Sequence, residues 1–320
     1  MPVNGVNGTG GVTGVTGTGS GAGALGCAAF KNDPTLAKIA TGAAPAIAKG
    51  APKSDTVKTM QCALYSLGYI DKRTSLDGAF GPGTETAVKA FQAKAGVAQS
   101  GKLDANTLQA LDKASSAQIA QLQKQQLPDG SKRGQYKITA DISDPTQTRL
   151  YVIGKDNKIA ARYLTSPGSS AFPTQGTNFT VSDALPRQPW NPPASGWAAK
   201  AKQVPPGIDN PMGIMKLSLG QYAEYIHGIP ASEEAELGHA ASHGCLRVSG
   251  SNILELSEKY AEAGTKVTVN RDKNLGAQLR QEYQTEGVQD RPTTAGREYM
   301  FGYMSGELGK RGHYSPAPGA

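Results

Sequence analysis

Two hydrophobic periods divide this chain. Over residues 55–113, apolar positions recur every three or four residues, which predicts short amphipathic helices. From residue 136 onward, apolar and polar residues alternate, as in Tyr136, Ile138, Ala140 and Ile142, and this pattern predicts half-buried strands. Gly and Pro interrupt the alternating runs at short intervals. We therefore expect a multidomain α+β protein, with a small helical module followed by a mainly β, sandwich-like domain.

The helical module contains three predicted helices separated by Asp/Gly turns. The first helix ends at Gly68 and the second at Gly96, and turns follow at Asp77-Gly78 and at Gly101. This arrangement resembles the type 1 peptidoglycan-binding module over nearly its full length. Most matching residues are expected core or turn positions, so a purely structural role stays open beside wall binding. They are Met60, Gln61, Leu64, Gly68, Tyr69, Asp77, Gly78, Phe80, Gly81, Thr84, Phe91, Gln92 and Thr107.

The segments outside the two domains differ in composition. Residues 1–30 contain ten Gly and no charged side chain, and such a chain buries too little surface to offset its ordering entropy. The connector after the module carries Gln and Lys and is expected to stay helical up to Leu127. The predicted boundaries are 1–52 for a flexible segment, 53–113 for the helical module, 114–135 for a linker, 136–271 for the β domain and 272–320 for an extension of unknown role.

Composition narrows the classes of partner. The net charge is +7 and the isoelectric point is near 9.2, which suits anionic wall polymers but also simple solubility. No run of five Lys and Arg residues occurs, so nucleic-acid binding is not predicted. No apolar run reaches the ~18 residues of a membrane span. The three Cys residues do not resemble a disulfide framework.

The candidate chemistry is concentrated in Ser242-His243-Gly244-Cys245. If this segment is extended, residues two apart share a face, and His243 is then placed to accept the Cys245 proton. A free thiol has a pKa of roughly 8.5, and a neighbouring His lowers it enough to give a nucleophile at neutral pH. The simpler interpretation is a buried Cys that packs as a small apolar residue.

His227, fourteen further residues and then the Ser-His-Gly-Cys run resemble the signature of the L,D-transpeptidase catalytic domain, the YkuD-like family. One departure from the family is Gly250, where an Asn is usual. Because Gly and Asn both adopt left-handed backbone readily, we expect an unchanged loop at this position. The resemblance runs from about Tyr136 to Arg271 and includes Leu150–Val152, Phe172–Gly176, with Gln175 in place of a Pro, Trp190–Pro193, Asp209–Gly213 and Gly264–Val269.

The resemblance implies a reaction. Cys245 would attack the carbonyl of the third stem-peptide residue and expel the terminal D-alanine, and the thioester would pass to an amine to give a 3–3 cross-link. His243 would be the base. His227 would orient substrate or steady charge, with a satisfied strand-end histidine as the alternative.

Further roles are expected around this centre. Backbone N–H groups of Gly244 and Cys245 are candidate oxyanion donors. Ser242 is expected to fix the loop or His243. Arg247 and Gly228 are candidate substrate-binding residues, and for Arg247 the alternatives are to hold a substrate carboxylate or to brace the loop.

Two alternatives concern metal and function. His227, His239, His243 and Cys245 are zinc-compatible ligand types, but their spacing matches no zinc motif. We therefore expect no metal or cofactor, and His239 as a loop residue. The same acyl-enzyme supports L,D-carboxypeptidase activity if water is the acceptor, and a non-catalytic wall-binding protein is a further possibility.

The expected partners are peptidoglycan stem peptides and glycan, in the periplasm or cell wall. Residues 1–30 lack the basic start and apolar core of a secretory signal. The sequence therefore leaves the export route open, including delivery as an injected effector or a phage virion protein.

Overall fold

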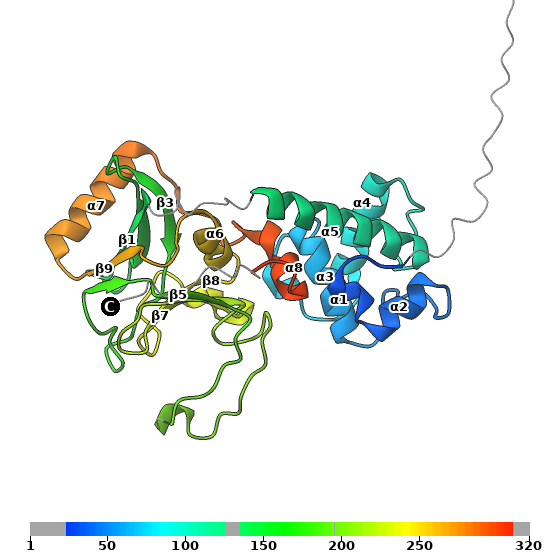
Figure 1. The fold of residues 1–320 in the computed structure, drawn as a ribbon, viewed down its shortest axis with the longest axis horizontal. Coiled ribbons are helices and arrows are strands. Elements are labelled where there is room, and N and C mark those ends of the chain that lie inside the picture. Colours follow the sequence, from blue (N-terminus) through cyan, green and yellow to red (C-terminus); the bar gives the residue numbers. More distant parts are fainter. Residues whose placement is uncertain (1–23, 126–134, 195, 310–320) are drawn as a thin grey trace, which may run out of the picture.

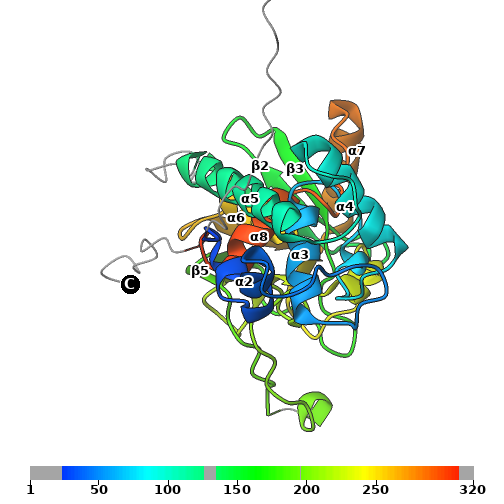
Figure 2. The same cartoon turned by 90° about the vertical axis from the view of Figure 1, so that its right-hand side faces the viewer.

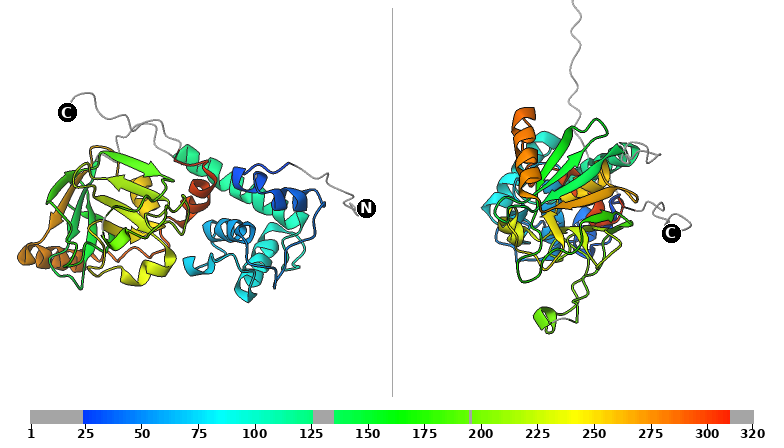
Figure 3. Two further views of the ribbon diagram at one scale, coloured as in Figure 1. Left: turned by 90° about the horizontal axis from the view of Figure 1, so that it is seen from below. Right: turned by 90° about the vertical axis from the view of Figure 1, so that its left-hand side faces the viewer.

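The structure is a computed structural model that describes residues 24–125, 135–194 and 196–309. A helical region and a two-sheet region lie side by side (Figure 1, and from below in Figure 3). Their buried apolar residues form one contiguous cluster across both regions, so the two pack as a single unit. The predicted α+β organisation is confirmed.

The helical module is held by two buried glutamines that serve its two turns in the same way. The Gln61 amide accepts from Gly78 N–H at 2.8 Å and the Gln92 amide accepts from Gly101 N–H at 2.9 Å. Each also donates to a threonine hydroxyl. The residues shared with the peptidoglycan-binding module therefore act mainly in the fold. The helices are α3 (Asp55–Ser66), α4 (Pro82–Ala95) and α5 (Ala105–Gln125), with the 3-10 turn η1 (Arg73–Ser75).

One boundary prediction is wrong in the described residues. Residues 24–52 are not a flexible tether, because α1 (Ala28–Lys31) and α2 (Pro34–Ala40) bury Phe30 and Leu36 against the module. The Gly-rich composition ends before these apolar residues. Residues 114–125 are helical as expected, because α5 continues through them, and Ile119 is buried there. Residues 1–23 and 126–134 lie outside the described part.

The catalytic-domain candidate consists of two sheets. Strand order is β3-β2-β1-β9-β4 in one sheet and β5-β6-β7-β8 in the other. Helix α6 (Asn252–Lys259) follows β8 and buries Ile253, Leu254 and Leu256. The strands are β1 (Lys137–Asp141), β2 (Arg149–Ile153), β3 (Ile159–Leu164), β4 (Asn178–Thr180), β5 (Asp183–Pro186), β6 (Met215–Ser218), β7 (Tyr225–Ile229), β8 (Leu246–Ser249) and β9 (Lys266–Asn270).

The extension that begins at residue 272 has two separate positions. Helix α7 (Lys273–Glu286) covers the five-stranded sheet, where Leu279 joins a small apolar cluster with Tyr151. Helix α8 (Arg297–Ser305) lies between the two regions (Figure 1) and contacts α3, α5 and α6; Figure 2 shows it next to α3 and α5. The Phe301 ring lies 4.8 Å from the Phe30 ring. The extension therefore joins the two regions.

A long excursion connects β5 to β6 and carries the 3-10 turn η3 (Gly196–Ala198) near its tip, away from the body of the domain (Figure 3). Its two limbs pair at Trp190 and Val204. Within the described ranges, no helix is long and apolar enough to cross a membrane.

Candidate active site

Three neighbouring strands bring charged and imidazole side chains into one row. Lys216 of β6 is paired with His227 of β7, and His227 is paired with Arg247 of β8. Directly paired residues on adjacent strands share a face of the sheet. Cys245 immediately precedes β8 on the same face. These four residues line a groove of about 870 Å³, together with Tyr225 and Trp197.

The Cys245 thiol is partly exposed. Burial raises its pKa to about 11, and the Glu224 carboxylate adds to that rise. The Tyr225 backbone N–H, Arg247 and Lys216 oppose it. At neutral pH the group is therefore a thiol, and nucleophilic chemistry here needs a base to remove its proton.

His227 is an imidazole held in one tautomer. Its ring is 3% exposed, and Nδ1 lies 2.7 Å from the Gly228 carbonyl oxygen. A carbonyl only accepts, so Nδ1 carries the proton and Nε2 keeps its lone pair. Burial, with smaller contributions from Arg247 and Lys216, lowers the pKa of His227 to about 4. The ring is neutral at pH 7, and its Nε2 is a hydrogen-bond acceptor.

His243 occupies a different setting. Its ring is exposed and stacks on Trp197 at 3.9 Å between centroids, with Phe172 4.7 Å away. Residues 242–245 are not an extended strand, because Gly244 has φ +125° and β8 begins only at Leu246. The assumption that His243 and Cys245 share a strand face is therefore wrong. No hydrogen bond joins the two among the described residues.

The turn before Cys245 is fixed from two sides. Ser242 Oγ donates to Cys245 O at 2.6 Å and accepts from Gly244 N–H at 3.1 Å. Thr174 Oγ1 donates to Gly244 O at 2.6 Å. Ser242 thus braces the turn, as one of its two expected roles. Because the Gly244 N–H is committed to Ser242, it does not fit the expected role of a free oxyanion donor, and Cys245 N–H is the remaining local candidate.

Arg247 and Gly228 lie in different surroundings. Arg247 lines the groove and is held by Glu236 at 2.7 Å and Glu233 at 3.4 Å, both on the 3-10 segment η4 (Ala231–Glu236). Gly228 faces α6 instead, where an added Cβ would lie 2.9 Å from the Ile253 side chain. A substrate contact from Gly228 does not fit this placement.

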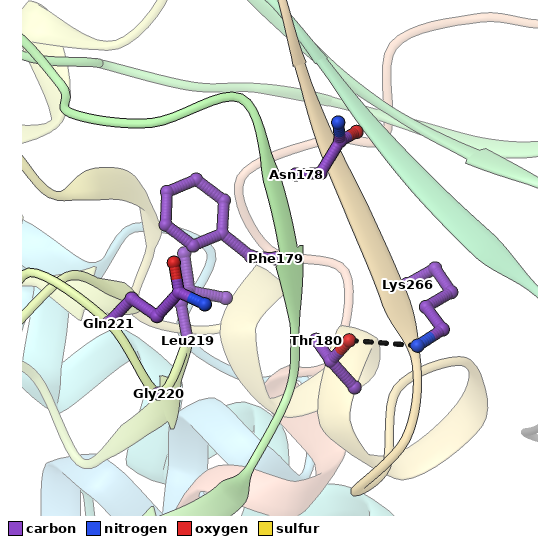
Figure 4. Close-up of a pocket in the computed structure, with 7 residues that line it drawn as sticks. All are labelled: Asn178, Phe179, Thr180, Leu219, Gly220, Gln221 and Lys266. Carbon is purple, nitrogen blue, oxygen red and sulfur yellow. Dashed lines mark hydrogen bonds between the residues drawn. The ribbon is translucent and has the colours of Figure 1, made fainter.

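The alternative of a metal centre requires a cluster of ligand side chains. In residues 24–125, 135–194 and 196–309, no three His, Cys, Asp or Glu side chains gather as a metal-binding group. His239 is exposed and does not line the groove. A second hollow, of about 340 Å³, lies beside β4 (Figure 4). Its seven lining residues contain a Lys266–Thr180 hydrogen bond of 3.0 Å but no thiol or imidazole.

Several residues in or near the groove were given no role from the sequence. Lys216 is a polar residue in an alternating run, and this alternation could have indicated the face of the strand on which its side chain lies. Trp197 and Phe172 are exposed aromatic residues, 46% and 40% accessible, which is unusual enough to suggest a surface role. Glu224 is buried with one carboxylate oxygen unpartnered, and its sequence context contains no signal for that environment.

Family models match both regions. Residues 53–111 match a peptidoglycan binding domain and residues 135–269 match the L,D-transpeptidase catalytic domain. These two matches agree with the two resemblances that the sequence indicated, one for each region. A comparison with curated protein sequences gave no match.

Solved structures include similar proteins at low identity. An L,D-transpeptidase from Mycobacterium smegmatis is 20% identical, with 42% of this chain and 58% of that chain covered and a TM-score of 0.35. One from Enterococcus faecium is 20% identical, with 42% and 50% covered and a TM-score of 0.33. A fused Zn-dependent amidase/peptidase with a peptidoglycan-binding domain, from Clostridium acetobutylicum, is 18% identical, with 71% and 100% covered and a TM-score of 0.28. This chain thus spans 58% and 50% of the length of the two transpeptidases.

Proposed function

We propose that this protein is a cysteine acyl-transferase that acts on peptidoglycan stem peptides at the cell wall, an L,D-transpeptidase. One observation carries the proposal. Inside the matched catalytic domain, the Cys245 thiol, directly before β8, and the neutral His227 imidazole of the neighbouring strand β7 line the same groove.

The reaction begins with proton transfer. Cys245 Sγ attacks the carbonyl carbon of the third stem residue while its proton passes to His227 Nε2. The tautomer held by Gly228 favours His227 for this role over His243. Cys245 N–H donates to the developing oxyanion.

The tetrahedral intermediate collapses to a thioester. The C–N bond breaks, and the D-alanine amine takes the proton from His227 as it leaves. A stem-peptide amine then attacks the thioester, giving a 3–3 cross-link and restoring the thiol. Water as acceptor would give a trimmed tripeptide, so transfer and hydrolysis share the same first half.

The other groove residues have proposed roles in substrate binding and in support of the groove. Arg247 is already paired with two carboxylates, which favours bracing over capture of a substrate carboxylate. Lys216 lies against the Tyr225 ring at 4.5 Å and faces the groove. We assign the carboxylate of the departing D-alanine to Lys216, and the exposed stack of Trp197 and His243 to the groove wall.

The direct test is incubation with a disaccharide-tetrapeptide, followed by mass analysis. We expect loss of one alanine together with dimers, or with tripeptide if hydrolysis dominates. Cys245→Ser keeps the size of the side chain and should give neither product. Equal turnover by wild type and Cys245→Ser would refute the assignment of the nucleophile.

The helical module has a separate proposed role in binding wall polymer. Its family match supports this role. Isolated sacculi should retain the full chain. When soluble muropeptide is added as a competitor for the catalytic groove, the part of the sacculus binding that comes from the module should remain. The module is packed on the catalytic domain. Its contribution to sacculus binding should therefore not depend on a flexible connection between the two domains.

A further inference from the structure

We propose that Arg73, a residue of the helical module, is a positioning residue for the catalytic groove. It fixes η4, whose carboxylates hold Arg247 beside Cys245. This inference deepens the proposed function and rests on it, because it makes the two domains one functional unit.

Arg73 crosses from one domain into the other. It begins η1, and its side chain is 3% exposed. One guanidinium nitrogen donates to Glu234 of η4 at 2.6 Å, and another donates to the Ile229 carbonyl at 2.9 Å. Ile229 ends β7, two residues after His227. The module therefore contacts both the strand that carries the base and the segment that supports Arg247.

Gly250 provides the space for this contact. A Cβ at Gly250 would lie 2.5 to 2.7 Å from three atoms of the Arg73 guanidinium. Gly250 does not belong to the residues with positive φ, so the explanation expected from the sequence, left-handed backbone, is wrong. The position lacks a side chain because a guanidinium from the other domain occupies the place.

The contact continues to the groove through η4. Glu234 also accepts from Ser249 Oγ at 2.7 Å, which ties η4 to the end of β8. On the same short segment, Glu233 and Glu236 hold the Arg247 guanidinium. Without Arg73, the Glu234 carboxylate would be left partly buried with no cation, which favours rearrangement of the segment. Arg247 would move with the carboxylates that hold it.

Removal of Arg73 should also change the electrostatic potential at the Cys245 thiol. Arg247 stabilises the Cys245 thiolate, and Arg73 neutralises a nearby carboxylate. An unbalanced Glu234 and a displaced Arg247 both reduce the positive potential at Cys245 Sγ. Ionisation of the thiol should therefore become harder when Arg73 is removed, although Arg73 itself does not line the groove.

The test compares Arg73→Met with Arg297→Met in the full chain. Arg297 also lies between the domains, with its backbone carbonyl bonded to Ser66, but its ion pair is with Asp71 and not with η4. The readout is the rate of Cys245 alkylation by iodoacetamide against pH. We expect a higher midpoint for Arg73→Met and a wild-type midpoint for Arg297→Met.

Two further variants keep the test decisive. Gly250→Ala should displace the guanidinium and give the same higher midpoint as Arg73→Met. Arg73→Lys, which retains a charge for Glu234, should recover part of the shift and carries the test if Arg73→Met does not fold. With muropeptide substrate, kcat should fall about tenfold for Arg73→Met, with little change in KM.

Unchanged alkylation profiles in Arg73→Met and Gly250→Ala, with only a lower melting temperature, would overturn the proposal and leave Arg73 as an interdomain clamp. Alkylation needs no substrate. A shifted profile in a protein that never turns over muropeptide would therefore contradict the proposed function and retain the positioning role of Arg73.

Discussion

The two histidines near Cys245 belong to regions that are held in place differently. His227 is set by strand pairing and by a backbone carbonyl, in a sheet whose other face packs on α6. His243 lies in a turn and is held by stacking on Trp197, a residue from the distant β5–β6 excursion. The histidine nearer in sequence to Cys245 is thus the one with fewer fixed contacts. Sheet topology, more than sequence spacing, decides which imidazole serves the thiol.

The largest expected effect tests this contrast directly. His227→Ala should lower kcat/KM by about 10² to 10⁴, the range for loss of a positioned base. His243→Ala should cost far less. Steady-state kinetics on a soluble muropeptide, with circular dichroism to check folding, measures both. A larger loss from His243→Ala would reverse the assignment of the base and place the proton on the exposed ring.

A second prediction concerns Glu224, which links the strand of His227 to the segment that holds the turn of His243. It precedes β7 and accepts a hydrogen bond from Gln175 N–H, next to the Thr174 that holds the turn containing His243. Burial raises the pKa of Glu224 to about 7, above the roughly 4.3 of an unfolded glutamate. The folded state therefore binds the proton more tightly than the unfolded state.

The contribution of Glu224 to the free energy of unfolding should consequently be largest below about pH 4, and it should be lost as pH rises through 7. The expected loss is up to about 4 kcal/mol in the free energy of unfolding. Urea denaturation at several pH values measures it, and Glu224→Gln should flatten the dependence. If the two proteins show parallel pH profiles, Glu224 is ionised in the folded state.

The smallest expected effect belongs to the stacked turn. Trp197→Ala removes a stacking partner worth about 1 kcal/mol, so KM should rise by less than about tenfold while kcat changes little. His243→Phe preserves a ring for stacking and should stay near wild type, unlike His243→Ala. Loss of kcat in His243→Phe would show that the imidazole acts chemically.

Much of this molecule could be predicted from local pattern. Alternation located β1, β2 and β9, and helical spacing located α3 and α4. The resemblance of the motif that contains His227 and Cys245 implied that the two lie side by side, and both line one groove. Local propensity holds no such long-range information.

The errors arose where contacts between distant segments decide the outcome. The rule that residues two apart share a face fails across Gly244, whose φ of +125° ends the extended backbone. The average composition of residues 1–52 concealed Phe30 and Leu36, which are buried only because α8 and α5 supply a surface for them. No local signal at Gly250 could reveal a guanidinium that arrives from residue 73.

The packing of α8 also affects the order in which the chain can fold. Ala28 N–H donates to the Glu307 carboxylate, a contact between residues 279 positions apart, and Phe30 meets Phe301 nearby. During synthesis, the first helices leave the ribosome long before their partner helix exists. The helical region must therefore wait, with Phe30 still uncovered, until the last described helix emerges. Such late closure of a long loop is slow and exposes apolar surface to aggregation.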